Sequence, residues 1–298
     1  MTDSRSIAQP QLSIILPAKN EAGGLRHTLP ALKQLFPAAQ ILVVNDGSTD
    51  GTLNVCREFG VDVVTHAYSK GNGAAIKSGA RTARGDILVF MDADGQHRPE
   101  DIPRLLQRMA EGYDMVVGAR SRASQAGAHR AAANGLYNVL ASWIVDQRVD
   151  DLTSGFRAVK AHLFRQFLYL LPNGFSYPTT ITMSFFRAGY SVAYEPIVAP
   201  ERIGKSHIRL GRDGLRFFII IFKIGTLYSP LKLFVPISAV FFLTGFSYYV
   251  YTLLTTHRFT NMSALLFITS ILVFLIGLVS EQISTLNYKD SNSSPPHS

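Results

Sequence analysis

The chain has 298 residues, of which 47% are hydrophobic and only 17% are charged, and its formal charge at pH 7 is +8. This length suits one large domain or a domain with an appendage, and the charged share lies below the usual value of about 25%. The single cysteine, Cys56, excludes an internal disulfide and a zinc site built from several cysteines.

The N-terminal segment, MTDSRSIAQPQ, is polar and lacks the apolar stretch of a signal peptide. We therefore expect a disordered segment at 1–11, followed by a domain that stays in the cytoplasm. This domain is expected to span 12–210, up to a basic segment that precedes the first long apolar run.

From residue 12 onward, short apolar runs alternate with segments of helical spacing. The runs are continuous and rich in β-branched residues, as in strands buried on both faces of a sheet. This alternation predicts an α/β fold with a mostly parallel sheet and helices on both faces, in which ligands bind beyond the carboxyl ends of the strands. The predicted strands are 12–17, 40–46, 61–66, 86–92, 113–119 and 192–197, and the predicted helices are 24–36, 50–60 and 73–84.

The region 120–200 has a less regular pattern. It begins with SRASQAGAHRAAANG, which is polar and rich in Ala and Gly. This composition predicts a mobile loop that leads into a helix at 132–147.

Two runs near the C-terminus, 233–254 and 262–280, contain no charged residue. Each is close to the roughly 20 residues that a helix needs to cross a bilayer. Two buried helices of a soluble core are the alternative, but the runs are apolar on all sides. We therefore expect an integral membrane protein with two transmembrane helices within 231–286, a disordered tail at 287–298 and an amphipathic helix on the membrane surface at 211–230.

Basic residues crowd the approach to the first apolar run, whereas the linker between the runs carries one Arg. The positive-inside rule then places the domain and the C-terminal tail in the cytoplasm, at the inner membrane if the source is bacterial. A nucleic-acid surface is the competing explanation, but a position beside a membrane span favours anionic lipid headgroups and no nucleic acid. The basic residues are Arg202, Lys205, Arg209, Arg212, Arg216, Lys223 and Lys232.

Acidic residues cluster at the ends of three of the predicted strands. Glu21 comes after the first, Asp46 and Asp50 lie at the end of the second, and Asp92 and Asp94 at the end of the fourth. Three of these aspartates precede Gly and also suit tight turns or helix caps. However, carboxylates gathered at one sheet edge repel each other unless a cation lies among them, and Mg²⁺ typically takes one or two carboxylates together with substrate phosphates. Because no Walker A or GxGxxG sequence is present, the pattern argues against a nucleoside triphosphatase or a dinucleotide enzyme.

Six motifs follow one another between residues 11 and 210: LPAKNE, VVNDGSTDGT, KGNGAAIKSGARTARGD, FMDADGQHRPEDIPRLL, VVGAR and DDLTSGFRA. In residues and in order they closely resemble the family 2 inverting glycosyltransferases. With two spans after them, the chain is similar to the polyprenyl-phosphate glycosyltransferases, the dolichol-phosphate-mannose-synthase-like branch. The resemblance implies a GT-A, Rossmann-like fold.

The resemblance also implies a site for a nucleotide-sugar donor, a UDP- or GDP-sugar. Asp94 matches the principal metal ligand, Asp92 a residue near the ribose and the metal, and Gln96 a third group of the metal site. The metal would be Mg²⁺ or Mn²⁺ and would stabilise the departing nucleoside diphosphate. The positions matched to the donor are Pro17, Asn20, Glu21, Asn45, Asp46, Asp92 and Ala93, with Asn45 standing where many members have Asp.

Arginine residues follow the fifth predicted strand. A lipid phosphate is already anionic at pH 7, so as a nucleophile it needs orientation and charge balance rather than a general base. Arg suits bidentate contact with phosphate. Arg120 and Arg130 match family positions that bind the acceptor phosphate, whereas Asn134 stands where relatives have Ser. The alternative for each Arg, and above all for Arg122, is a solvated loop charge.

The segment ERIGKSHI, at 201–208, is similar to a family loop that closes over the donor diphosphate. The usual order in that loop is Ser-Lys, whereas this chain has Lys-Ser-His, and a juxtamembrane basic patch is the alternative. The implied phosphate contacts are Arg202, Lys205, Ser206 and His207.

Four residues have no role fixed by the motifs. Asp151 or Ser154 lines the sugar pocket, or the Ser154-Gly155 pair forms a structural turn. His97 and His129 are interpreted as loop residues.

The leading hypothesis is transfer of a single sugar from a nucleotide-sugar to a polyprenyl phosphate, of undecaprenyl or dolichyl type, with inversion. Membrane lipids are further partners, and homo-oligomers through the transmembrane helices remain open. A processive polysaccharide synthase is an alternative, but its Gln-x-x-Arg-Trp element is absent, since the only Trp is Trp143. A catalytically inactive scaffold of the same fold is another, but such a protein would be expected to lose part of the acidic donor site. No motif specifies the sugar, the base or the lipid length.

Overall fold

The structure is a computed structural model that describes residues 11–120, 128–174, 176–198, 222 and 225–292, with the backbone alone at 128–134, 136 and 287–292. The chain divides into two compact units. The first combines Met1–Leu140 with Gln147–His207, and the second combines Ala141–Asp146 with Ile208–Ser298.

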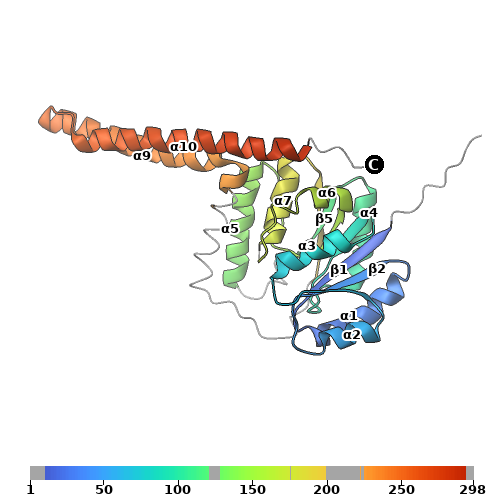
Figure 1. Cartoon of the computed structure of the whole chain (residues 1–298). Coiled ribbons are helices and arrows are strands. Elements are labelled where there is room, and N and C mark those ends of the chain that lie inside the picture. Colours follow the sequence, from blue (N-terminus) through green and yellow to red (C-terminus); the bar gives the residue numbers. More distant parts are fainter. Residues whose placement is uncertain (1–10, 121–127, 175, 199–221, 223–224, 293–298) are drawn as a thin grey trace, which may run out of the picture. The chain divides into compact units, whose positions relative to one another are not determined.

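The first unit is built on a seven-stranded sheet in the order β3-β2-β1-β4-β6-β5-β7 (Figure 1). β6 runs antiparallel to its neighbours β4 and β5, and the other paired strands are parallel. The predicted α/β fold with a mostly parallel sheet is thereby confirmed. The strands are β1 (Leu12–Ala18), β2 (Gln40–Asn45), β3 (Asp62–Thr65), β4 (Ile87–Phe90), β5 (Met115–Arg120), β6 (Arg157–Lys160) and β7 (Val192–Ile197).

Helices cover both faces of this sheet, which is why its central strands are apolar without alternation. On one face, α1, α2 and α4 pack against a core that contains Ile14, Leu16 and Val43. On the other face, α3 lies so close that a Cβ on Gly79 would be 2.4 Å from Ile15. The helices are α1 (Ala22–Leu35), α2 (Thr52–Glu58), α3 (Asn72–Thr82), α4 (Ile102–Ala110, after a 3-10 turn at Pro99–Asp101), α5 (Ala128–Val145), α6 (Ala161–Gln166) and α7 (Tyr177–Arg187).

Two parts of the fold differ from the expectation. α5 begins at Ala128 rather than at 132 and ends at Val145, so the predicted mobile loop falls partly within a helix, while 121–127 lies outside the described residues. β6 was not expected, because four residues with a charge at each end give no periodicity. Its position is set by long-range pairing, in which Arg157 lies opposite both Phe90 of β4 and Val117 of β5.

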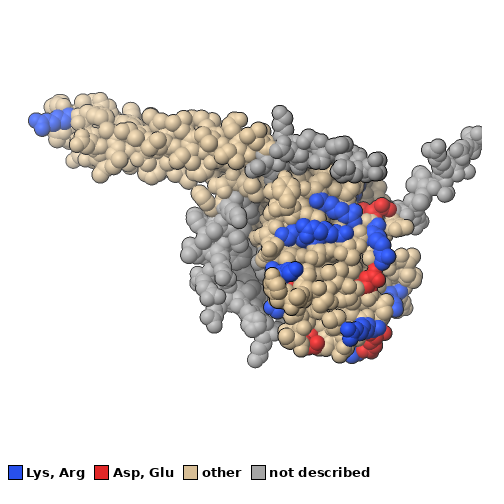
Figure 2. Space-filling view, in the orientation of Figure 1, with Lys and Arg blue, Asp and Glu red and all other residues tan. Residues whose placement is uncertain are grey.

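The second unit contains a hairpin of two helices, α9 (Pro230–Thr256) and α10 (Asn261–Asn292). Both are long and apolar enough to cross a membrane, and only 6% and 17% of the residues in their apolar windows are buried within the protein. A buried helix pair in a soluble core would show the opposite. Figure 2 shows the hairpin without charged side chains over most of its visible length. The expected surface helix at 211–230 falls largely outside the described residues.

Hydrogen bonds join the two helices of the hairpin in the middle of their apolar length. The hydroxyl of Ser238 donates to the carbonyl of Ser270, and the hydroxyl of Ser270 donates to the carbonyl of Ser238, both at 2.9 Å. α9 ends at Thr256 and is followed by His257, whose φ of +53° is the left-handed conformation common after a helix. α10 continues to Asn292, beyond the expected boundary at 286.

The loop after β4, Asp92–His97, packs against α1 through a glycine. A Cβ on Gly24 would lie 2.0 Å from the carbonyl oxygen of Ala93, a distance that no side chain tolerates. A Cβ on the neighbouring Gly23 would meet no atom within 4 Å. The two adjacent glycines of α1 are therefore a matched pair, of which one alone controls the position of the loop.

We predict opposite effects for the two alanine substitutions. Gly23→Ala should leave the free energy of unfolding unchanged or raise it by up to about 1 kcal/mol, because Ala is the better helix former. Gly24→Ala should lower it by roughly 1–3 kcal/mol, because the new methyl group overpacks against Ala93. Unfolding of the full chain in detergent would measure both, and equal effects would contradict the close contact.

Candidate functional site

The sheet brings the predicted donor and acceptor residues of the described chain to one edge. β1, β2, β4 and β5 all end at this edge, and the antiparallel β6 begins there. The loops that contain Asn20, Asp46 and Asp92, and the end of β5 at Arg120, therefore lie at the same edge as the segment that precedes Arg157. This is the edge at which ligands bind in open α/β sheets.

The loops after β1 and β2 are fastened to each other. The N–H of Asn20 donates to Ser48 Oγ at 3.0 Å, and its side-chain oxygen accepts the N–H of Thr49 at 2.8 Å. Asn20 has a φ of +57°, which Asn tolerates better than most residues. Asp50 accepts N–H groups from the first residues of both α1 and α2 at 3.2 and 3.0 Å, so it caps two helices. The loops after β1 and β2 are thus held together by their own hydrogen bonds.

Asp46 has a fully occupied carboxylate. Its oxygens accept hydrogen bonds from His66 at 2.7 Å, from the Ser69 hydroxyl at 2.8 Å, and from the N–H groups of Lys70 and Gly71 at 2.8 and 2.9 Å. Burial opposes its ionisation, but these hydrogen bonds, led by that from His66, outweigh burial and lower the pKa of Asp46. Asp46 therefore holds the loop before α3 in place through these hydrogen bonds. A direct contact between Asp46 and the nucleoside stays a prediction.

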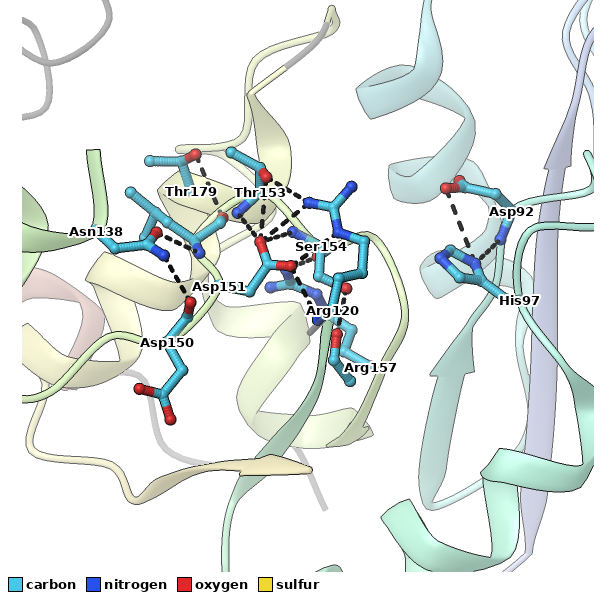
Figure 3. Close-up of polar contacts among 12 residues, drawn as sticks. Asp92, His97, Arg120, Asn138, Asp150, Asp151, Thr153, Ser154, Arg157 and Thr179 are labelled. Carbon is cyan, nitrogen blue, oxygen red and sulfur yellow. Dashed lines mark hydrogen bonds and ion pairs between the residues drawn. The ribbon is translucent and has the colours of Figure 1, made fainter. Parts of the chain in front are cut away.

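The Asp92–His97 loop closes on itself through two hydrogen bonds. Gly95 has a φ of +78°, and the N–H of Gln96 donates to Asp94 Oδ1 at 3.0 Å. The N–H of Asp92 donates to Nδ1 of His97, also at 3.0 Å (Figure 3). Within the described residues no group of three or more His, Cys, Asp or Glu side chains is arranged around a common metal position. Two carboxylates on one loop fit a cation whose remaining ligands are water and substrate phosphate.

His97 is not the plain loop residue that the sequence indicated. Its ring is buried and stacks on Phe156, with centroids 4.9 Å apart and planes 17° apart. Burial lowers its pKa to about 4, although the charge of Asp94 opposes the shift. His97 is therefore neutral at pH 7, and because Nδ1 accepts the Asp92 N–H, its proton is on Nε2.

Arg120 forms a bidentate ion pair with Asp151 (Figure 3). Nε and Nη2 of Arg120 donate to the two carboxylate oxygens at 2.8 and 3.0 Å, and Nη2 also donates to Thr153 Oγ1 at 2.6 Å. Burial raises the pKa of Asp151, but the hydrogen bonds and the charge of Arg120 lower it by more. The net pKa is therefore below the usual value, and both groups stay charged at pH 7. The guanidinium, 28% exposed, is held in one orientation by a carboxylate that is 3% exposed.

The segment from Asp151 to Arg157 is held in place by the buried side chain of its last residue, Arg157. Arg157 is fully buried and donates to the carbonyls of Pro178, at 3.2 Å, and Ser154. Ser154 donates its hydroxyl to the Gly118 carbonyl at 2.6 Å, which ties this segment to β5, while a pocket role for Asp151 or Ser154 stays a prediction. A Cβ on Gly155 would lie 3.2 Å from Asp92 Oδ2, which shows how closely this segment approaches the Asp92–His97 loop.

Several predicted site residues are outside the described side chains. Arg130 and Asn134 lie in the first turns of α5, where the backbone alone is described. The donor-loop segment at 201–208 is outside the described residues altogether. The roles expected for Arg122, His129, Arg130, Asn134, Arg202, Lys205, Ser206 and His207, and for Pro17, Glu21, Asn45 and Ala93, stay predictions.

Several curated proteins with similar sequences carry undecaprenyl phosphate or polyprenol in their names. The undecaprenyl-phosphate mannosyltransferase of Micrococcus luteus is 30% identical over 224 residues, which cover 67% of this chain and 88% of that protein. The undecaprenyl-phosphate 4-deoxy-4-formamido-L-arabinose transferase of Proteus mirabilis is 31% identical over 163 residues, 51% of this chain and 50% of that protein. The chain thus spans about half the length of the arabinose transferases that it matches.

Solved structures with the same fold include the glucosyl-3-phosphoglycerate synthase of Mycobacterium tuberculosis. Its complex with Mn²⁺, UDP-glucose and phosphoglyceric acid aligns with a TM-score of 0.61 and 21% identity, over 73% of this chain and 80% of that one. At this identity the likeness shows the GT-A-like fold alone.

Two family models match the chain itself. Residues 229–286 match the GtrB C-terminal hairpin, which are the residues of α9 and most of α10. Residues 13–170, more than half of the chain, match glycosyl transferase family 2. The chain therefore belongs to glycosyl transferase family 2.

Proposed function

We propose that the protein transfers a single sugar from a nucleotide-sugar to a polyprenyl phosphate, with inversion at the anomeric carbon, to give a polyprenyl-phosphate-linked sugar. The observation that carries the proposal is the juxtaposition at one sheet edge of an acidic loop, Asp92–His97, and a fixed guanidinium, Arg120. The C-terminal hairpin and the names of the relatives support a lipid acceptor.

We propose that the donor binds over the loops after β1, β2 and β4. Asp94 and Asp92, together with Gln96, would hold Mg²⁺ or Mn²⁺, which would supply positive charge to stabilise the departing nucleoside diphosphate. Asp50 and Asn20 keep the β1 and β2 loops together, so the nucleoside meets a preformed surface. Arg202, Lys205 and Ser206 are proposed to contact the diphosphate from the following loop.

The acceptor phosphate is placed on the side of β5. A phosphate monoester is a charged nucleophile at pH 7, so the protein has to orient it beside the anomeric carbon rather than deprotonate it. Asp151 fixes the plane of the Arg120 guanidinium, and a planar guanidinium suits phosphate oxygens. Arg130 and Asn134 are proposed to complete this site, with the hairpin anchoring the protein to the membrane and the catalytic unit on its cytoplasmic side.

A direct assay tests the proposal. The full chain in detergent or nanodiscs is incubated with undecaprenyl phosphate, Mn²⁺ and a panel of UDP- and GDP-sugars, and the lipid product is detected by mass spectrometry. We expect one donor of the panel to give a glycosylated lipid. Failure of every donor to react, with a folded protein and intact lipid, would contradict the proposal.

Turnover is predicted to depend on the cation and on Asp94. Removal of divalent metal by a chelator should abolish product formation, and added Mn²⁺ should restore it. Asp94→Asn should reduce kcat/KM by roughly 100-fold or more, about 3 kcal/mol of transition-state stabilisation, because the amide is a much weaker cation ligand. Asp62→Asn, at the opposite end of the sheet, is the matched control and should keep activity. Unchanged turnover in Asp94→Asn would rule out its role as a ligand.

Arg120 is predicted to act on the acceptor and not on the donor. Arg120→Lys keeps the charge but loses the planar fork, so the KM for the polyprenyl phosphate should rise, with kcat/KM for the acceptor falling by roughly 10–100-fold. The KM for the nucleotide-sugar should change little. Arg148→Lys replaces an exposed arginine that also pairs with a neighbouring aspartate, and it should behave as the native protein. An effect of Arg120→Lys on the donor KM alone would assign this residue to the other substrate.

A further inference from the structure

The last backbone hydrogen bond between β1 and the chain after β4 marks the place where the Asp92–His97 loop leaves the sheet. The N–H of Met91 still donates to the carbonyl of Ile15 of β1 at 3.1 Å. The next N–H, that of Asp92, points to the other side of the strand, where β6 is the neighbour, and it donates to Nδ1 of His97 at 3.0 Å. A side chain thus takes the acceptor role of a strand carbonyl at the residue where the predicted ligands begin, and it closes the loop from its far end.

His97 is itself held by a residue on the acceptor side of the edge. Its buried ring stacks on Phe156, and the carbonyl of Phe156 accepts the N–H of Gly118 at 2.9 Å. Gly118 makes room for this arrangement, because a Cβ there would lie 2.6 Å from the Phe156 ring. Gly118 is in β5, two residues before Arg120. Contacts therefore run without interruption from the Asp92 backbone through His97 and Phe156 to β5.

We propose that His97 is a positioning residue that sets where Asp92 and Asp94 lie relative to Arg120. It does so by accepting the Asp92 N–H while its ring rests on Phe156, and it touches neither substrate. The inference rests on the proposed function in assigning the loop to a metal and the arginine to the acceptor.

The two contacts of His97 can be separated by substitution. In His97→Asn, the side-chain oxygen takes the place of Nδ1 and keeps the acceptor, but the ring that stacks on Phe156 is lost. In His97→Phe, the ring is kept and the acceptor is lost. If His97 were merely a packing residue, Phe would be the better replacement, whereas positioning through the hydrogen bond favours Asn.

The experiment measures loop order first in the metal-free full chain in detergent. Hydrogen–deuterium exchange of the peptide that contains Asp92 should be faster in His97→Phe than in the native protein and close to native in His97→Asn. The dissociation constant for Mn²⁺, followed by electron paramagnetic resonance, should rise by about 10–100-fold in His97→Phe and recover to within a few-fold in His97→Asn, as for other residues that orient metal ligands. His27→Phe, on the exposed face of α1, is the control for replacing a histidine by phenylalanine.

Three results would overturn the inference. The first is native exchange and native Mn²⁺ affinity in His97→Phe. The second is fast exchange and weak Mn²⁺ binding in His97→Asn, with both properties closer to native in His97→Phe. The third is an equal effect of His97→Asn, His97→Phe and His27→Phe. If His97→Phe does not fold, His97→Asn decides alone, since fast exchange at Asp92 in that variant contradicts the hydrogen bond and native exchange supports it. Because exchange is measured without metal, donor or lipid, it reports on His97 even if no sugar transfer is found.

Discussion

The direction of one short strand determines how the site is assembled. β6 lies between β4 and β5 and runs opposite to both, so the chain enters it at the edge where the other two strands end. The segment before β6 consequently approaches the Asp92–His97 loop through Gly155 and forms the ion pair with Arg120 through Asp151. A parallel strand in the same place would have carried this segment to the far end of the sheet. The Asp92–His97 loop and the Arg120–Asp151 ion pair are therefore separated by a single strand, and the same segment contacts both.

Charge at this edge is balanced in several separate ways. The charge of Asp46 is stabilised by hydrogen bonds from N–H groups, a hydroxyl and His66, and that of Asp151 is balanced by a guanidinium. Arg157 adds a buried positive charge that is met by carbonyl oxygens. The loop after β2 also holds two carboxylates, but those of Asp46 and Asp50 accept several hydrogen bonds from the protein, and the divalent cation is therefore proposed for the loop of Asp92 and Asp94. Lone acidic residues in a sequence do not reveal which of these solutions each one uses.

The sequence was sufficient for the regular parts of the fold and for the site edge. Continuous β-branched runs predicted six of the strands, and uncharged runs predicted both helices of the hairpin. It did not reveal β6, since Arg157–Lys160 is defined by pairing with β4 and β5 rather than by its own pattern. It also did not reveal His97, because a histidine after a turn looks solvated until the ring of Phe156, far along the chain, is placed beside it. The Asp151 partner of Arg120 was missed for the same reason.

The paired serines of the hairpin have a mechanical consequence. In the hydrocarbon core of a bilayer no water competes for a hydroxyl or a carbonyl, so the reciprocal hydrogen bonds between Ser238 and Ser270 have no replacement there. Sliding one helix along the other by a single turn would break both bonds at once. Gly245 and Gly277 bring the helices close on either side, at Leu266 and Phe234. The hairpin should therefore tilt or move in the membrane as one rod of fixed register, rather than as two independent helices.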